Sequence, residues 1–378
     1  MAGKASASAS NPRLPGIDSL RFWLALWVYF SHFGFLPFGA WIGKSTPLRL
    51  MLTGAANSLF DGAAAVIGFF IISGLCIHYP FRSKPVELLP FYARRYIRIL
   101  LPLGMALVLS RLVDNNLMGF YAAILWSLVC EEVYYAIYPI LRIGIQKLRW
   151  KWMLLGSYAA AVAVMATNIR ALNFHEFGPG LTWVVGLPCW LLGCHLAETV
   201  GKTKPREVSL VRIWVWRLAM WGLGSAATLL RFHGGIGYPI SLTLMGPLLY
   251  YWLRLEIDRK QRVASFEYAG KFSYSTYLIH VVAASVLVLL VPSAKADTAL
   301  NGILRLVFVL GFSYCFFLLI EQPSHQFARY AARLISDARQ GRSRAKETVP
   351  AGTHFRAPIK PRSLAAAAAE AGEGGQQD

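Results

Sequence analysis

Long apolar runs recur along almost the whole chain. About ten of them, each roughly 17–22 residues long, are long enough for a helix to cross a hydrocarbon core of ~30 Å. Only 15% of the 378 residues are charged, against about 25% in an average protein. The sequence therefore predicts an all-α, polytopic, multi-pass membrane protein rather than a soluble domain. The spans are expected at roughly 20–38, 60–80, 97–113, 118–141, 152–169, 181–199, 212–230, 237–254, 272–292 and 302–321.

The net charge of +19 is distributed unevenly between the two sides of the expected membrane. If both termini are cytoplasmic, all but seven of the 38 lysines and arginines fall on the cytoplasmic side. The exceptions are Lys44, Arg49, Arg111, Arg170, Arg231, Lys295 and Arg305. This asymmetry is typical of the positive-inside rule. The basic charge thus predicts topology, and nucleic acid is excluded as the expected partner.

The five cysteines indicate neither a disulfide framework nor a metal site. All of them fall inside expected spans, and none belongs to a CxxC motif. We expect them to be small buried hydrophobic residues, and we expect no metal cofactor.

Composition divides the chain into four segments. Residues 1–16 form an expected disordered tail, and 17–323 form one transmembrane domain. Residues 324–340 combine apolar residues near helical spacing with arginines, which predicts a basic amphipathic helix on the inner leaflet. Residues 341–378 are rich in Gly, Ser, Ala and Pro and are expected to be a disordered tail.

Very few ionisable residues lie well inside the expected spans. They are His32, Glu131, Glu132 and His280. A charge at mid-membrane costs at least ~2.5–3.5 kcal/mol, so such residues usually serve a function. These four side chains are therefore the first candidates for the chemistry of the protein.

The first span, GIDSLRFWLALWVYFSHFG, carries an arginine and a histidine eleven residues apart. At ~100° per residue, Arg21 and His32 lie on one face of a helix, with a rise of about 16 Å between them. Arg21 would lie at the cytoplasmic mouth and His32 in the outer half of the bilayer. Separately, they would be an interfacial anchor and a buried histidine bonded to a neighbouring helix. Together they indicate a long ligand with an anionic head in the cytoplasm.

The third span begins with FYARRYIRIL, which places Arg94, Arg95 and Arg98 at the cytoplasmic side. Each of the first two shares a helix face with Arg98. Arginine suits bidentate phosphate recognition. The alternative is ordinary positive-inside anchoring.

Three other stretches contain polar residues with either structural or functional interpretations. ILWSLVCEEVYYAIYPIL holds Glu131, Glu132 and Tyr135, and its adjacent glutamates point ~100° apart. GKFSYSTYLIHVV aligns Tyr277 and His280 on one stripe, together with Ser273. FFIISGL places Ser73 beside a glycine. Hydrogen bonding and close packing between helices are the structural alternatives.

The order of these motifs resembles that of the acyltransferase-3 family of integral membrane proteins. The resemblance extends from Ile17 to Pro323 through IDSLRFWLALWVYFSH, FFIISGL, FYARRYIRIL, WSLVCEEVYYAIYP, FSYSTYLIH and EQP. The family's second-span acidic residue is replaced by Ile67, its early glycine is Ser19, and its closing ERP is EQP here. Members transfer acyl groups, mostly acetyl, from coenzyme A to cell-surface sugars and related acceptors.

The resemblance implies His32 as the catalytic histidine, with Glu131 and Glu132 as acidic candidates to assist it. It implies Arg21, Arg95 and Arg98 as contacts to acyl-CoA, and the helical spacing of the third span adds Arg94 to this predicted set. Pocket residues toward the acceptor would be Ser73, Tyr135, Tyr277 and His280. Histidine is suited to act either as a general base or as an acyl-accepting nucleophile, and the sequence leaves both open.

The predicted function is therefore transfer of an acyl group, most simply acetyl, from cytoplasmic acyl-CoA to a hydroxyl of a glycan or its lipid-linked precursor. The expected location is the bacterial inner (plasma) membrane, and the expected partners are acyl-CoA, a glycan or glycolipid acceptor and the bilayer. Two alternatives remain at this stage. One is a proton-coupled transporter or flippase of a glycan or lipid, and the other is a structural partner of a polysaccharide synthase.

Overall fold

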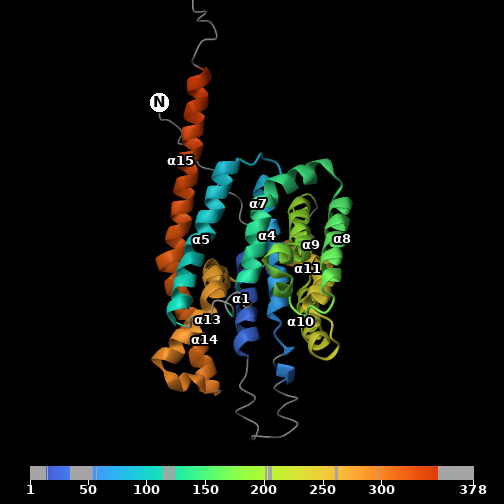
Figure 1. The fold of residues 1–378 in the computed structure, drawn as a ribbon, viewed down its shortest axis with the longest axis vertical. Helices are drawn as coiled ribbons and strands as arrows, with labels where there is room; N and C mark the ends of the chain where they lie inside the picture. The colour runs from blue at the N-terminus through green and yellow to red at the C-terminus, as the bar shows by residue number, and fades with distance from the viewer. Residues whose placement is uncertain are drawn as a thin grey trace, which may run out of the picture. The chain divides into compact units, whose positions relative to one another are not determined.

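The computed structural model describes residues 14, 16–34, 54–56, 58–113, 119, 124–200, 202, 207–259, 263–296 and 298–347, with side chains up to 339. This part of the chain is helical almost throughout and contains no strand (Figure 1). Its main helices are α1 (Ile17–Phe33), α4 (Gly62–His78), α5 (Leu88–Val113), α7 (Trp126–Lys147), α8 (Trp150–Thr167), α9 (Gly178–Thr199), α10 (Leu210–His233), α11 (Tyr238–Arg259), α12 (Ala264–Ala269), α13 (Ser273–Leu290), α14 (Ala299–Phe316) and α15 (Gln322–Glu347).

Six helical stretches among the described residues are long and apolar enough to cross a membrane. They are Gly62–Phe81, Leu88–Val113, Phe174–Thr199, Leu210–His233, Ala264–Leu290 and Ala299–Arg339. The predicted class, an all-α polytopic membrane protein, is confirmed. The expected total of about ten spans stays a prediction.

The chain separates into two compact units, one ending at Arg333 and one beginning at Leu334. Helix α15 covers the predicted amphipathic segment 324–340, and its helical backbone continues to Glu347. The membrane-surface role of that segment stays a prediction. Almost all of the predicted tail 1–16, and the predicted tail from 348 onward, lie outside the described residues.

Helices α4 and α9 pack side by side at the centre of the first unit (Figure 1). Both are almost wholly apolar, and most of their residues are buried. Glycines allow their backbones to touch: a Cβ on Gly74 would meet the Trp190 carbonyl oxygen, and one on Gly193 would meet that of Ile71. Small residues at helix contacts provide such close packing in membranes. Gly74 of the FFIISGL motif is therefore a packing residue.

We expect Gly74→Ala to destabilise the folded protein by about 1–3 kcal/mol, because the added methyl group collides with backbone rather than with a movable side chain. The measurement is thermal unfolding in detergent. Gly156→Ala on α8 is the matched control, since a Cβ there meets nothing within 4 Å. Equal unfolding temperatures for the two variants would contradict the assignment of Gly74 to packing.

Helix α1 lies against α4, α12 and α13. At its first turn, the Ser19 hydroxyl donates a 2.6 Å hydrogen bond to Glu267 on α12. The ring of Trp23 packs edge-on against Phe266, with centroids 4.9 Å apart. Ser19 thus helps to bind α12 to the start of α1.

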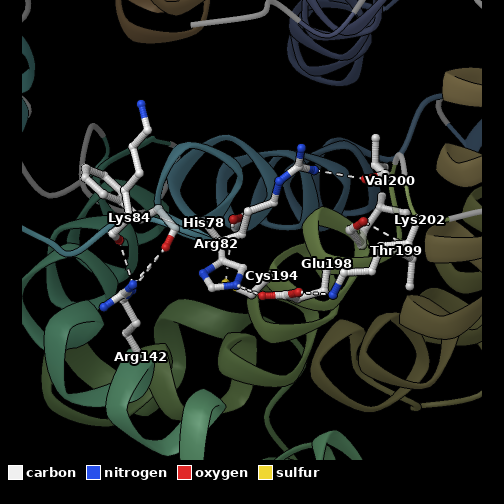
Figure 2. A network of polar contacts seen from close by, with 12 residues as sticks. His78, Arg82, Lys84, Arg142, Cys194, Glu198, Thr199, Val200 and Lys202 are labelled. Atoms are coloured by element: carbon white, nitrogen blue, oxygen red, sulfur yellow. Dashed lines mark hydrogen bonds and ion pairs between the residues drawn. The ribbon is translucent and has the colours of Figure 1, made fainter.

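A polar network connects the ends of α4, α7 and α9 (Figure 2). His78 is buried, and its Nε2–H donates to Glu198 over 2.9 Å. Glu198 also pairs with Lys202 at 2.6 Å. Arg142 of α7 donates to the carbonyl oxygens of Phe81 and Lys84, and Arg82 donates to Val200. These bonds hold the segment between α4 and α5.

Candidate functional site

Helix α1 carries Arg21 in its second turn and His32 in its last turn. The helix is continuous between them, so the eleven-residue spacing places both on one face with a rise of about 16 Å. Arg21 is half-buried and His32 is exposed. The far end of α1 is held against α4, because Gly62 sits on the Ser31 side chain. One continuous helix therefore connects two chemically different sites, one around Arg21 and one around His32.

The first place is a convergence of three arginines, Arg21 from α1 and Arg95 and Arg98 from α5. Arg21 and Arg98 both interact electrostatically with Glu131 and with Glu321. Arg95 interacts with Tyr135, the side chain that donates to Glu131.

Within the described residues, none of these three guanidinium groups forms an ion pair within 4.0 Å. Guanidinium groups suit bidentate recognition of phosphates, so the predicted role of these arginines in binding the donor stays a prediction that this arrangement is compatible with.

Arg94 differs from the other arginines of its motif. Its side chain is exposed, and its Nε donates to the Pro90 carbonyl oxygen of its own helix over 3.2 Å. Arg95 and Arg98 are half-buried. The structure thus brings together Arg21, Arg95 and Arg98, and leaves Arg94 at the periphery.

Glu131 lies in a hydrogen-bonded group formed by α4, α7 and α9. The Tyr135 hydroxyl donates to Glu131 over 3.2 Å and lies 3.0 Å from the Ser73 hydroxyl. The Trp190 indole donates to Ser73 over 3.3 Å. Ser73 and Tyr135, both expected in the pocket, therefore hold Glu131 close to the arginines.

Glu132 occupies a separate environment. Both of its carboxylate oxygens are buried without a hydrogen-bond partner among the described residues. Its electrostatic neighbours include Tyr96 on α5 and Tyr274 on α13. The described residues contain no hydrogen bond or ion pair between either glutamate and His32. The assistance that Glu131 or Glu132 would give to His32 therefore stays a prediction.

The second place is the His32 end of α1, where the neighbouring side chain is His280 of α13. The two imidazole centroids are 5.1 Å apart, with ring planes inclined by 44°. His280 is buried, and its Nδ1 lies 2.8 Å from the Tyr277 carbonyl oxygen. Its Nε2 is buried and has no hydrogen-bond partner in the described part of the chain. The pair unites two of the four ionisable residues predicted inside the membrane.

Tyr277 lies on the same face of α13 as His280, but its side chain forms contacts to another helix. Its hydroxyl is 2.6 Å from the Ser127 hydroxyl and donates to the Ile124 carbonyl oxygen over 3.3 Å. These bonds attach α13 to the start of α7. Tyr277 therefore fixes the helix that carries His280.

Two further residues lie at the arginine end, and the sequence did not predict a role for either of them. Glu321 is buried and accepts 2.5 Å and 3.2 Å hydrogen bonds from the hydroxyl and backbone N–H of Ser275. His325 lies one turn on, with Nε2 3.5 Å from Glu321, and interacts electrostatically with Arg21 and Arg98. The EQP motif was the sequence feature that could have identified Glu321. In the structure, Glu321 ends a π-helical turn, a feature frequent at functional sites.

Across the described ranges, no three His, Cys, Asp or Glu residues gather as a metal ion would need. The residues that gather are instead arginines at one end of α1 and imidazoles at the other.

A family model described as an acyltransferase domain matches residues 14–322. Among curated proteins, acyltransferase MdmB from Streptomyces mycarofaciens is 25% identical over 261 residues, which cover 59% of this chain and 64% of that relative. The chain thus spans less than two thirds of the length of that relative. No solved structure matches.

Proposed function

The chain belongs to the acyltransferase-3 family, and on this premise we propose that it transfers an acyl group from acyl-CoA to a hydroxyl of a glycan or its lipid-linked precursor. The acyl group is most simply acetyl. The protein would work as a multi-pass protein of the bacterial inner membrane, with acyl-CoA arriving from the cytoplasm.

One observation carries the proposal: α1 spans the distance between three arginines and a histidine pair. The arginine end supplies positive charge that no carboxylate in the described part of the chain pairs with, which suits the phosphates of coenzyme A. The rise of about 16 Å to His32 is comparable with the reach of an extended pantetheine arm. A thioester held in this way would lie beside an imidazole.

The chemistry follows from the residues at each end. His32 takes the proton from the acceptor hydroxyl as its oxygen attacks the thioester carbonyl, and the released thiol regains a proton. Alternatively, His32 attacks the thioester first and forms an acyl-imidazole, which the hydroxyl then cleaves. Both routes break the carbon–sulfur bond and form one ester bond. Glu131, held by Ser73 and Tyr135, faces the arginines and would help to position the donor.

The experiment compares the cell-envelope glycans of a deletion strain with those of the strain complemented by the wild-type gene. We expect mass spectrometry to find an acyl mass on a glycan or lipid-linked precursor only when the wild-type protein is present. The acyl mass identifies the donor group, and fragmentation locates the acceptor.

Purified protein provides the second arm of this test. We expect release of free coenzyme A thiol from acetyl-CoA to depend on extracted acceptor. Unchanged glycan masses together with no thiol release would refute the proposed function.

A further inference from the structure

The buried imidazole of His280 has a defined hydrogen-bonding state. Its Nδ1 faces the carbonyl oxygens of Tyr277 at 2.8 Å and Thr276 at 3.2 Å. A carbonyl oxygen only accepts hydrogen bonds, so Nδ1 carries the proton and the neutral ring keeps a free lone pair on Nε2. The backbone of α13 thereby makes Nε2 of His280 a hydrogen-bond acceptor.

That acceptor is buried and unsatisfied. Nε2 has no hydrogen-bond partner among the described residues, although His280 itself is almost fully buried. The rings packed around it are those of His32, Phe33 and Tyr277, with centroids 5.1, 6.1 and 6.4 Å away. The phenol of Tyr277 is already bonded to Ser127. Of these three side chains, only that of His32 carries a ring N–H, and this N–H makes no hydrogen bond within the described ranges.

We propose that His280 is the positioning residue of His32: its Nε2 accepts the N–H of the His32 imidazole and leaves the other His32 nitrogen free to react. This inference rests on the proposed function and assigns to a histidine the task expected of Glu131 or Glu132. It also replaces the substrate contact expected of His280. Catalytic hydrogen bonds are often long in the absence of substrate, and the 5.1 Å ring separation lies within such an adjustment.

Two substitutions separate this role from a structural one. His280→Asn keeps a donor near the position of Nδ1, and so keeps the bond to the α13 backbone, but has no acceptor at the position of Nε2. His280→Gln places an amide oxygen near that position. We expect the asparagine variant to lose about 10- to 100-fold in kcat, a part of the ~10²–10⁴ that a general base supplies. The KM for the donor should stay within about two-fold, and the glutamine variant should recover most of the kcat.

Chemical labelling of His32 tests the hydrogen bond without any acyl transfer. Diethyl pyrocarbonate acylates the free nitrogen of neutral imidazole, and peptide mass spectrometry follows His32 itself. Accepting its N–H makes the other nitrogen more nucleophilic, so we expect slower labelling in the asparagine variant than in the wild-type or glutamine protein. Unfolding temperatures of both variants show whether they fold.

Several outcomes would overturn the inference. One is an equal loss of kcat in both variants together with unchanged labelling of His32, which would indicate that His280 has only a structural role. Another is a raised KM for the acceptor at constant kcat, which describes a substrate contact. Wild-type kcat in the asparagine variant would also refute it. Because labelling requires no acceptor, a negative result there is distinguishable from failure of the proposed function.

Discussion

Substitution of His32 by alanine is expected to abolish acyl transfer, lowering the rate by about 10²–10⁴-fold while the protein still folds and inserts. A positioned general base contributes this much, and an acyl-accepting nucleophile contributes at least as much. His32 is exposed, so its removal leaves no buried cavity. The measurement is acetyl-CoA-dependent thiol release with acceptor present, alongside glycan mass spectrometry of the complemented strain.

The control for this substitution is His233→Ala at the end of α10, where the histidine is also exposed. That variant should keep wild-type activity. Rapid quenching of wild-type protein with radiolabelled acetyl-CoA, without acceptor, separates the two chemical routes. Label bound covalently to His32 would show the acyl-imidazole route. Its absence, in protein that turns over fully once acceptor is added, would favour the general base. Full activity of His32→Ala would refute the assignment of this residue.

The second large effect is expected from removing charge at the arginine end. In Arg95→Gln and Arg98→Gln, we expect the affinity for acetyl-CoA to fall by at least ~10-fold each. A hydrogen bond to a charged group contributes about 1.5–3 kcal/mol, and 1.4 kcal/mol corresponds to ten-fold. The measurement is binding of acetyl-CoA to purified protein. S-acetylpantetheine, which lacks the nucleotide phosphates, should bind wild type and variants equally.

The matched control is Arg111→Gln, an exposed arginine near the other end of α5. It should leave the affinity for acetyl-CoA unchanged. Arg94→Gln is expected to have a smaller effect than either Arg95→Gln or Arg98→Gln, because Arg94 is exposed and bonded to Pro90. Equal losses for acetyl-CoA and S-acetylpantetheine would show that these arginines do not act on the phosphates.

The adjacent residues Ser73 and Gly74 show what a sequence motif does not determine. The FFIISGL motif was open to a structural or a functional interpretation, and only the contact of Gly74 with the α9 backbone decides for packing at that residue. Ser73, its neighbour, turns instead to Tyr135 and Trp190 and so supports Glu131. Adjacent residues on a helix face different neighbours, and a sequence alone does not say which helix each will meet.

The glutamates and histidines show the same limit at the site. Their rarity inside apolar spans identified them, because burying an ionisable group in a membrane is costly wherever it occurs. Which of these residues contact one another depends on packing between helices that are far apart in the sequence. His32 and His280 are separated by most of the chain, and they meet because α1 packs against α13. Glu321 and His325 reach the arginines by the same kind of long-range packing.

The sequence alone thus predicted three features. They are apolar runs long enough to form spanning helices, arginines expected on one side of the membrane, and the eleven-residue spacing that places Arg21 and His32 on one face. These properties depend on helix geometry and the cost of burying charge, both of which act over neighbouring residues. Tertiary structure alone decided that Arg94 stays outside the cluster and that a histidine, not a glutamate, faces His32. Those choices depend on how α1, α5 and α13 pack, which no local pattern determines.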